Sequence, residues 1–126
     1  VFNMEPKSIL MYNLNSEKGR KIKMLCLKNR IRIREVRPEQ YLEPIGYLAG
    51  MKEVSSNGDV YEGQGFEDEM LIFRGFDGQS LPAFLKEMAR NKVERIALKA
   101  VITSGNVGWT SIQLHEEIKK EHEALR

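Results

Sequence analysis

Residues 8–12 read SILMY, and residues 70–73 read MLIF. Both runs are apolar at consecutive positions, which is typical of a strand that is buried on both faces of a sheet. Residues 30–34 (RIRIR) alternate between arginine and isoleucine, and residues 96–100 (IALKA) nearly alternate. Alternation indicates a strand with one solvated face. The first and third runs are therefore predicted to be central strands, and the second and fourth are predicted to be edge strands.

Helical stretches separate these four runs, and helical crossovers connect parallel strands with a right-handed sense. The sequence therefore predicts an α/β fold: a small, open, mostly parallel four-stranded sheet with spatial order 2-1-3-4, like a truncated flavodoxin-like sheet, with helices on both faces. The strands are expected at about 8–14, 31–36, 69–74 and 95–102, and the helices at about 17–28, 80–91 and 111–125, with short helical turns at 38–42 and 44–50.

The bulk composition fits one globular domain covering residues 1–126. Apolar residues make up 41% of the chain and charged residues 30%, which are ordinary values for a globular protein. No apolar run approaches the roughly 20 residues of a membrane-spanning helix, and no signal-peptide pattern is visible. With Cys26 as the single cysteine, these features predict a cytoplasmic location. No internal repeat is apparent.

Charge is unevenly placed although the net charge is only +2. Residues 18–37 hold nine Lys or Arg and one acid, whereas residues 39–77 hold nine acids and two bases. Such segregation can steer an anionic partner, but solvated charged faces are also ordinary. The basic segment and nearby tyrosines could suit nucleic acid, yet the adjacent acids and the lack of any nucleic-acid-binding motif argue against that partner.

The segment at about 53–67 is polar and rich in turn-forming residues. It contains SSNGD at 55–59 and GQG at 63–65, and it shows neither helical nor strand periodicity. Loops of this length in compact domains are usually functional lids or mobile segments. The sequence leaves both alternatives open.

A ligand site is predicted from the position of the loops. In open parallel sheets, ligands bind beyond the carboxyl ends of the strands, where the strand order reverses, and here that point lies between the first and third strands. The loop at 103–106 could wrap a small anion with backbone N–H donors; alternatively it is a turn and helix cap, with the following tryptophan packing over the core. The predicted ligand-binding residues are Asn13, Asp77, Thr103, Ser104, Asn106 and Trp109.

No catalytic residue, metal ligand or cofactor is predicted. Cys26 shares an apolar helix face with Ile22 and Leu25, and a buried free cysteine mostly behaves as a small hydrophobe. His115 and His122 are seven residues apart on one predicted helix, about 10 Å along its axis, and are interpreted as part of a solvated face.

Several segments resemble a known family. They are IGYLAG at 45–50, GFEDEML at 65–71, Gly75-Phe76, and ALKAVIT at 97–103 with Asn106 and Trp109. With these segments the chain resembles the bacterial proteins grouped as domain of unknown function 3783, from about Ser8 to the C-terminus. The resemblance implies an intracellular bacterial protein, and it implies no activity, cofactor or catalytic residue.

Two classes of function remain. The first is a non-catalytic binding or regulatory module with a small-ligand site at the C-terminal edge of the sheet. The alternative is a protein-interaction domain or homodimer that uses the 53–67 loop and the edge strands. An enzyme is a weaker hypothesis, because the sequence places no nucleophile–base pair or carboxylate pair together.

Overall fold

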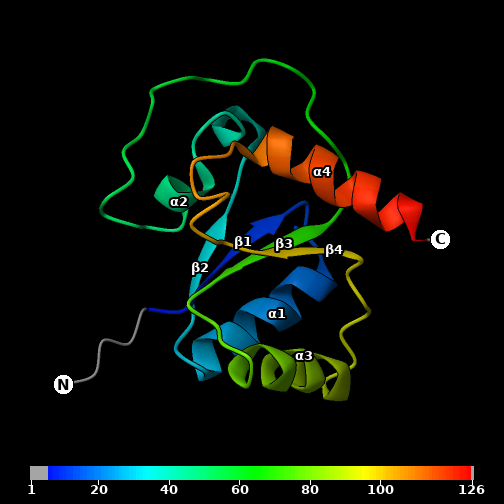
Figure 1. The fold of residues 1–126 in the computed structure, drawn as a ribbon. Coiled ribbons are helices and arrows are strands. Elements are labelled where there is room, and N and C mark those ends of the chain that lie inside the picture. Colours follow the sequence, from blue (N-terminus) through cyan, green and yellow to red (C-terminus); the bar gives the residue numbers. More distant parts are fainter. Residues whose placement is uncertain (1–5, 126) are drawn as a thin grey trace.

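The computed structural model describes residues 6–125, which form a four-stranded sheet covered by helices (Figure 1). All residues of β1 are buried, as are the first four of β3, whereas every residue of β2 is exposed. The predicted strand order and the central positions of the first and third strands are therefore confirmed. The strands are β1 (Ser8–Tyr12), β2 (Arg32–Glu35), β3 (Met70–Arg74) and β4 (Leu98–Val101), and their spatial order is β2-β1-β3-β4.

The helices lie on both faces of the sheet, as expected. In Figure 1, α1 and α3 lie below the sheet while α2 and α4 lie above it. Within residues 6–125, no helix combines the length and apolar character needed to cross a membrane. The helices are α1 (Glu17–Lys28), α2 (Ile45–Leu48), α3 (Ser80–Arg90) and α4 (Ser111–Ala124), with a 3-10 turn, η1 (Pro38–Gln40), after β2.

Each central strand contributes to two apolar cores because successive side chains point to opposite faces of a sheet. Ile9 and Phe73 lie in the core between the sheet and helices α1 and α3. Leu10 and Ile72 lie in the core on the side of α2 and α4. This arrangement explains why the central strands are apolar at consecutive positions.

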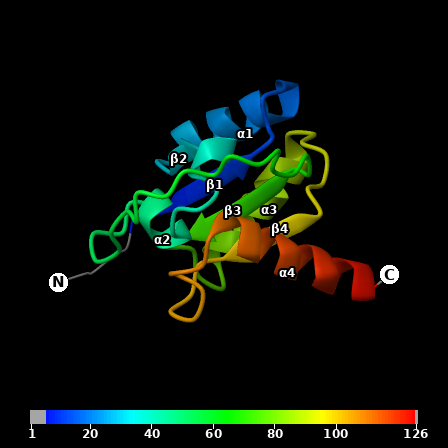
Figure 2. The same ribbon diagram turned by 90° about the horizontal axis from the view of Figure 1, so that it is seen from above.

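Strand direction differs from the expectation at the centre of the sheet. β1 pairs with β2 in parallel, and β3 pairs with β4 in parallel, so two of the three strand pairs have the predicted direction. β1 and β3 are antiparallel, with Ser8 opposite Arg74 and Tyr12 opposite Met70. After α2, the chain crosses the molecule before β3 begins, as Figures 1 and 2 show, and this long connection permits the reversal.

The two halves of the sheet are repeats of one unit, which the sequence did not reveal. β1 begins at Ser8 and β3 begins at Met70, so equivalent residues are 62 apart (70 − 8). The same spacing relates the left-handed residues Asn13 (φ 59°) and Gly75 (φ 82°), which follow β1 and β3. The correspondence lies in backbone conformation and strand register and not in the sequence, where no internal repeat is apparent.

The ends of α1 and α3 repeat in the same register. Arg30 (φ 57°) and Lys92 (φ 60°) are both left-handed, and they are also 62 residues apart. In each case the next residue donates a backbone hydrogen bond across the helix end, Ile31 to the carbonyl of Cys26 (2.8 Å) and Val93 to that of Met88 (3.0 Å). These are two copies of the Schellman motif.

A pseudo-twofold axis relates the two units. It passes between Leu10 and Ile72, which face one another at the centre of the antiparallel pair. The outer pairs correspond as well, since Ser8 faces Arg32 and Met70 faces Leu98. The second unit holds four additional residues, 94–97, before its outer strand. Two βαβ units that meet across a twofold axis in one sheet must have antiparallel central strands, which accounts for the direction of β3.

Candidate functional site

The structure divides the predicted ligand-binding residues between opposite ends of the sheet. Because β1 and β3 are antiparallel, the carboxyl end of β1 lies beside the start of β3. Asn13 follows β1 at that end, whereas Asp77 follows β3 at the other. Thr103, Ser104 and Asn106 follow β4, which is parallel to β3. The assumption that all these loops share one edge was wrong, and the six residues do not form one site.

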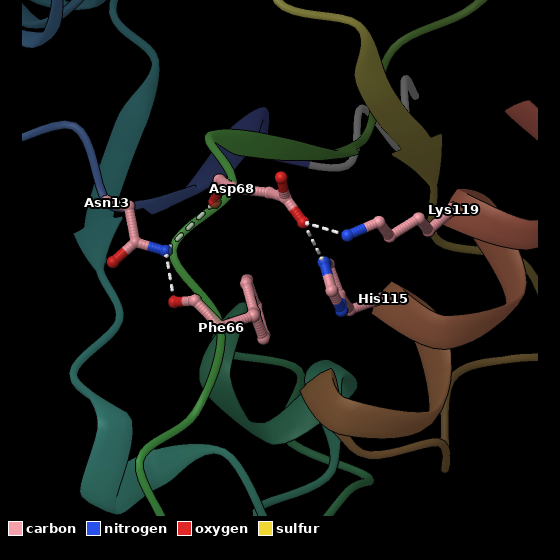
Figure 3. A network of polar contacts seen from close by, with 5 residues as sticks. All are labelled: Asn13, Phe66, Asp68, His115 and Lys119. Carbon is pink, nitrogen blue, oxygen red and sulfur yellow. Dashed lines mark hydrogen bonds and ion pairs between the residues drawn. The ribbon is translucent and has the colours of Figure 1, made fainter. Parts of the chain in front are cut away.

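Asn13 holds the segment that precedes β3 in place by hydrogen bonds to its backbone. Its side-chain amide donates to the backbone carbonyls of Phe66 (2.8 Å) and Asp68 (2.9 Å) (Figure 3). Both N–H donors of the amide are thus engaged within the protein. Asparagine also tolerates the left-handed backbone found here, so the position has a structural role.

Asp77 caps α3. Its carboxylate accepts hydrogen bonds from the backbone N–H groups of Gln79 (2.9 Å) and Ser80 (2.7 Å). These bonds, first that from Ser80, hold the pKa of Asp77 below its usual range. A capping carboxylate already occupied by two N–H groups is typical of a helix start.

The loop after β4 uses most of its own hydrogen-bond donors. The Thr103 N–H donates to the Asn106 side chain (2.8 Å). The Thr103 hydroxyl oxygen accepts from the N–H groups of Gly105 and Asn106, both at 3.2 Å. The Val107 N–H donates to the Thr103 carbonyl (3.0 Å). The arrangement is that of a closed turn, so backbone N–H groups of these residues do not form an open anion cradle.

Trp109 connects this loop to α2 and α4. Its carbonyl accepts the backbone N–H of Ile45 (2.8 Å), which begins α2. Its side chain is 37% exposed and borders a shallow hollow with Gln113 and Glu116 of α4. Trp109 therefore has a different role from Thr103 and Ser104, because it connects α2 and α4.

Thr103 and Ser104 nevertheless line a cavity of about 360 Å³ at the carboxyl ends of β3 and β4. Arg74, the last residue of β3, lines it as well. The remaining walls come from the segment after α2 and from the loop after β4: Met51, Glu53, Val54, Ile102 and Val107. Its volume lies within the range of small-molecule sites.

Arg74 is incompletely hydrogen-bonded. Its Nη1 donates to the carbonyl of Ala49, at the end of α2, over 3.4 Å. Its Nε is buried and has no hydrogen-bond partner within residues 6–125. A guanidinium group offers five N–H donors, and buried donors are nearly always satisfied in folded proteins. Arg74 is thus a cation that lines the cavity, and the N–H donors of its guanidinium group other than the covered Nε–H are the ones that an added acceptor can reach.

A second, wider crevice lies at the opposite edge, where β1 and β2 end. Its volume is about 840 Å³, and it lies at the end of the first βαβ unit that corresponds to the position of the cavity beside Arg74 in the second unit. Asn13, which lines this crevice, has both amide N–H groups engaged. The Arg37 N–H donates to the Gln40 side chain (3.0 Å). Asn15 and Arg37 also line the crevice, but none of its lining residues has a buried polar atom without a partner within residues 6–125, unlike Arg74.

His115 was wrongly interpreted as part of a solvated face. It is 8% exposed, and its Nε2 lies 2.8 Å from an Asp68 carboxylate oxygen, which also accepts from Lys119 (3.2 Å) (Figure 3). The hydrogen bond with His115, foremost, and the Lys119 ammonium lower the pKa of Asp68. No sequence signal could have paired Asp68 with His115, 47 residues away. Together with Asn13, they hold the segment before β3 against β1 and α4.

Aromatic stacking supports the same contact. Phe66 lies between His115, with ring centroids 3.7 Å apart, and Tyr41, at 4.7 Å. Deeper in the core, the Tyr12 hydroxyl lies 2.6 Å from the Ser111 hydroxyl, and burial raises the pKa of Tyr12. The Tyr12 and Ser111 hydroxyls are paired with each other, whereas the Tyr41 hydroxyl is buried with no hydrogen-bond partner within residues 6–125. The ring stacking and the Tyr12–Ser111 contact stabilise the fold.

Cys26 lies on the buried face of α1, and burial raises the pKa of its thiol to about 12. A protonated, buried thiol is unreactive. Within the described residues, no group of three or more His, Cys, Asp or Glu side chains is arranged to hold a metal ion.

Comparison with known proteins identifies one relationship. No curated protein and no solved structure matches the chain. Residues 69–125 match the family described as Domain of unknown function (DUF3783). This match spans β3, α3, β4 and α4, and it includes Arg74, Thr103 and Ser104. The chain thus resembles the Domain of unknown function (DUF3783) family across its second β-α-β-α unit, and the resemblance inferred from its sequence is confirmed there.

Proposed function

We propose that this protein is a non-catalytic binding module for a small ligand with a carboxylate or similar anionic group, held in the cavity beside Arg74, Thr103 and Ser104. The observation that carries the proposal is the state of Arg74, a cation that lines the cavity and whose guanidinium group donates one long hydrogen bond, to the Ala49 carbonyl at 3.4 Å. A guanidinium group offers five N–H donors. An acceptor brought by a ligand can bond to those that remain.

The neighbouring residues favour a carboxylate or another small oxyanion. Arginine binds such groups with paired N–H···O bonds. The Thr103 hydroxyl oxygen already accepts two backbone N–H groups, so its proton remains free to donate to the same ligand. The side chains around the cavity include neither histidine nor cysteine, which favours binding over acid–base or nucleophilic catalysis.

We further propose that the protein acts in the cytoplasm. Its single cysteine is a buried free thiol, as expected of a protein from a reducing compartment.

Binding can be tested with a panel of carboxylic acids and phosphates in a thermal-shift assay, followed by calorimetric titration of any compound that stabilises the protein. A ligand at about 100 times its Kd adds roughly 2.7 kcal/mol of stability. The same titration on Arg74→Gln should lose at least tenfold in affinity.

Arg32→Gln is the matched control, because Arg32 lies exposed on β2 and away from the cavity. This variant should bind the ligand as the wild type does. The proposal fails if no anion binds the wild type, or if Arg74→Gln, shown by circular dichroism to be folded, retains full affinity.

A further inference from the structure

The cavity holds two opposite charges that are not paired with each other. Arg74 and Glu53 both line it, yet none of the ion pairs within residues 6–125 includes either residue. Their charged atoms therefore lie farther apart than the 4.0 Å that defines an ion pair. Opposite charges that line one cavity without pairing suit a ligand that carries both signs.

The remaining walls are apolar. Val54 comes from the segment after α2, Ile102 from the end of β4, and Val107 from the loop before α4. The Cβ position of a side chain at Gly46 would lie 2.4 Å from a Val107 methyl carbon and 3.0 Å from a Val54 methyl carbon. The two valines thus meet α2 at its glycine, and this close packing gives the cavity a defined aliphatic wall.

We infer that the ligand is an α-amino acid with an aliphatic side chain, with its carboxylate at Arg74 and Thr103 and its ammonium group at Glu53. The inference rests on the proposed binding function at this same cavity. The aliphatic side chain lies against Val54, Ile102 and Val107, where it leaves water.

The charges also exclude other ligands. A dianion such as phosphate is disfavoured because Glu53 repels it. A simple cation is disfavoured because Arg74 repels it. A volume of about 360 Å³ accommodates one amino acid and is small for a nucleotide. Among small molecules, a zwitterion with an apolar group satisfies all three parts of the wall.

Calorimetric titration of the full chain with three related compounds tests the inference. L-leucine carries both charges, N-acetyl-L-leucine lacks the ammonium group, and L-leucinamide lacks the carboxylate. We expect leucine to bind at least tenfold more tightly than either analogue. Glu53→Gln should weaken leucine binding about tenfold and should leave N-acetyl-leucine binding equal or tighter, because a repelling charge is removed, whereas Arg74→Gln should weaken the binding of both.

Glu62→Gln is the control for Glu53→Gln, because Glu62 is an exposed acid of the same connection that does not line the cavity; its affinity for leucine should equal that of the wild type. If N-acetyl-leucine binds as tightly as leucine and Glu53→Gln changes nothing, the amino-acid inference is overturned while anion binding stands. If none of the compounds or the anion panel binds, both fail. The wild-type series decides between these outcomes even if a variant does not fold.

Discussion

The two left-handed helix ends predict that glycine substitution should stabilise this protein. Arg30 and Lys92 occupy equivalent positions after α1 and α3, with φ of 57° and 60°, and both side chains are exposed. Left-handed backbone costs a residue with a Cβ about 1–2 kcal/mol relative to the right-handed form. Glycine adopts it without that penalty, which is why glycine is common at this position.

The expected gain is smaller than the whole penalty. Glycine also has more conformational freedom in the unfolded chain, which reduces the gain in the free energy of unfolding by about 0.4–1 kcal/mol. Arg30→Gly and Lys92→Gly should therefore each raise the free energy of unfolding by about 0.5–1 kcal/mol. Urea-induced unfolding measures this change directly, with the slope of the transition expected to stay constant. The melting temperature should rise by about 2–4 °C per substitution.

Lys28→Gly and Arg90→Gly are the matched controls. These residues end α1 and α3 two positions earlier, in right-handed helix, where glycine lowers stability by up to about 1 kcal/mol. The sign of the effect should therefore reverse over two residues in both units. If Arg30→Gly or Lys92→Gly destabilises the protein as its control does, the left-handed assignment and the equivalence of the two units are wrong.

Three further predictions concern single residues. The Cys26 thiol, with its pKa raised to about 12 by burial, should not react with a disulfide reagent at pH 8 until the protein is unfolded; rapid native-state labelling would contradict its burial. Gly19→Ala places a Cβ 1.7 Å from the Leu14 carbonyl oxygen, so urea unfolding should show a loss of about 3 kcal/mol or no folded protein. Asp68→Asn should cost about 0.5–1 kcal/mol at pH 7, because the Asp68 pairs are partly exposed. The pKa of Asp68 is lowered in the folded protein, mainly by His115. The difference in free energy of unfolding between the wild type and Asp68→Asn should therefore have its full value above the ordinary aspartate pKa of about 3.9, and it should become smaller as the pH falls below that value. A difference that stays constant from pH 7 to pH 3 would refute the pairing.

The strands and their order were predictable because burial leaves a direct mark on sequence. A strand with two covered faces is apolar at consecutive positions, as residues 9–12 of β1 and 70–73 of β3 are. Strand direction leaves no such mark: Ser8–Tyr12 has the same composition whichever way its neighbour runs. The direction of β3 follows from the twofold relation of the two units, and the long connection after α2, which crosses the molecule before β3, permits it.

The repeat is not visible in the sequence because equivalent positions share burial and backbone conformation but not residue type. Across positions 8–31 and 70–93, Asn29 and Asn91 are the single identical pair. What persists is core position and backbone conformation: Ile22 corresponds to Phe84 in one core, and a left-handed residue follows each first strand and each first helix. The family match at 69–125 covers the second unit, and the first unit completes the sheet around it.

The candidate site was predictable only in part. Thr103 and Ser104 were identified because hydroxyl residues followed a predicted strand, and they do line a cavity. Arg74 was missed because a charge at a strand end is ordinary in sequence, and its incomplete hydrogen bonding is visible only in three dimensions. Glu53 was likewise read as part of a polar loop.

The most direct test of the account is to observe Arg74 itself during ligand titration. In a protein labelled with ¹⁵N-arginine, the side-chain Nε–H resonance of Arg74 can be assigned by its loss in Arg74→Gln. The account predicts that this resonance shifts and saturates as L-leucine is added, while the Arg32 resonance does not move. If leucine and the anion panel leave the Arg74 resonance unchanged at millimolar concentration, the cavity at the ends of β3 and β4 is not a binding site.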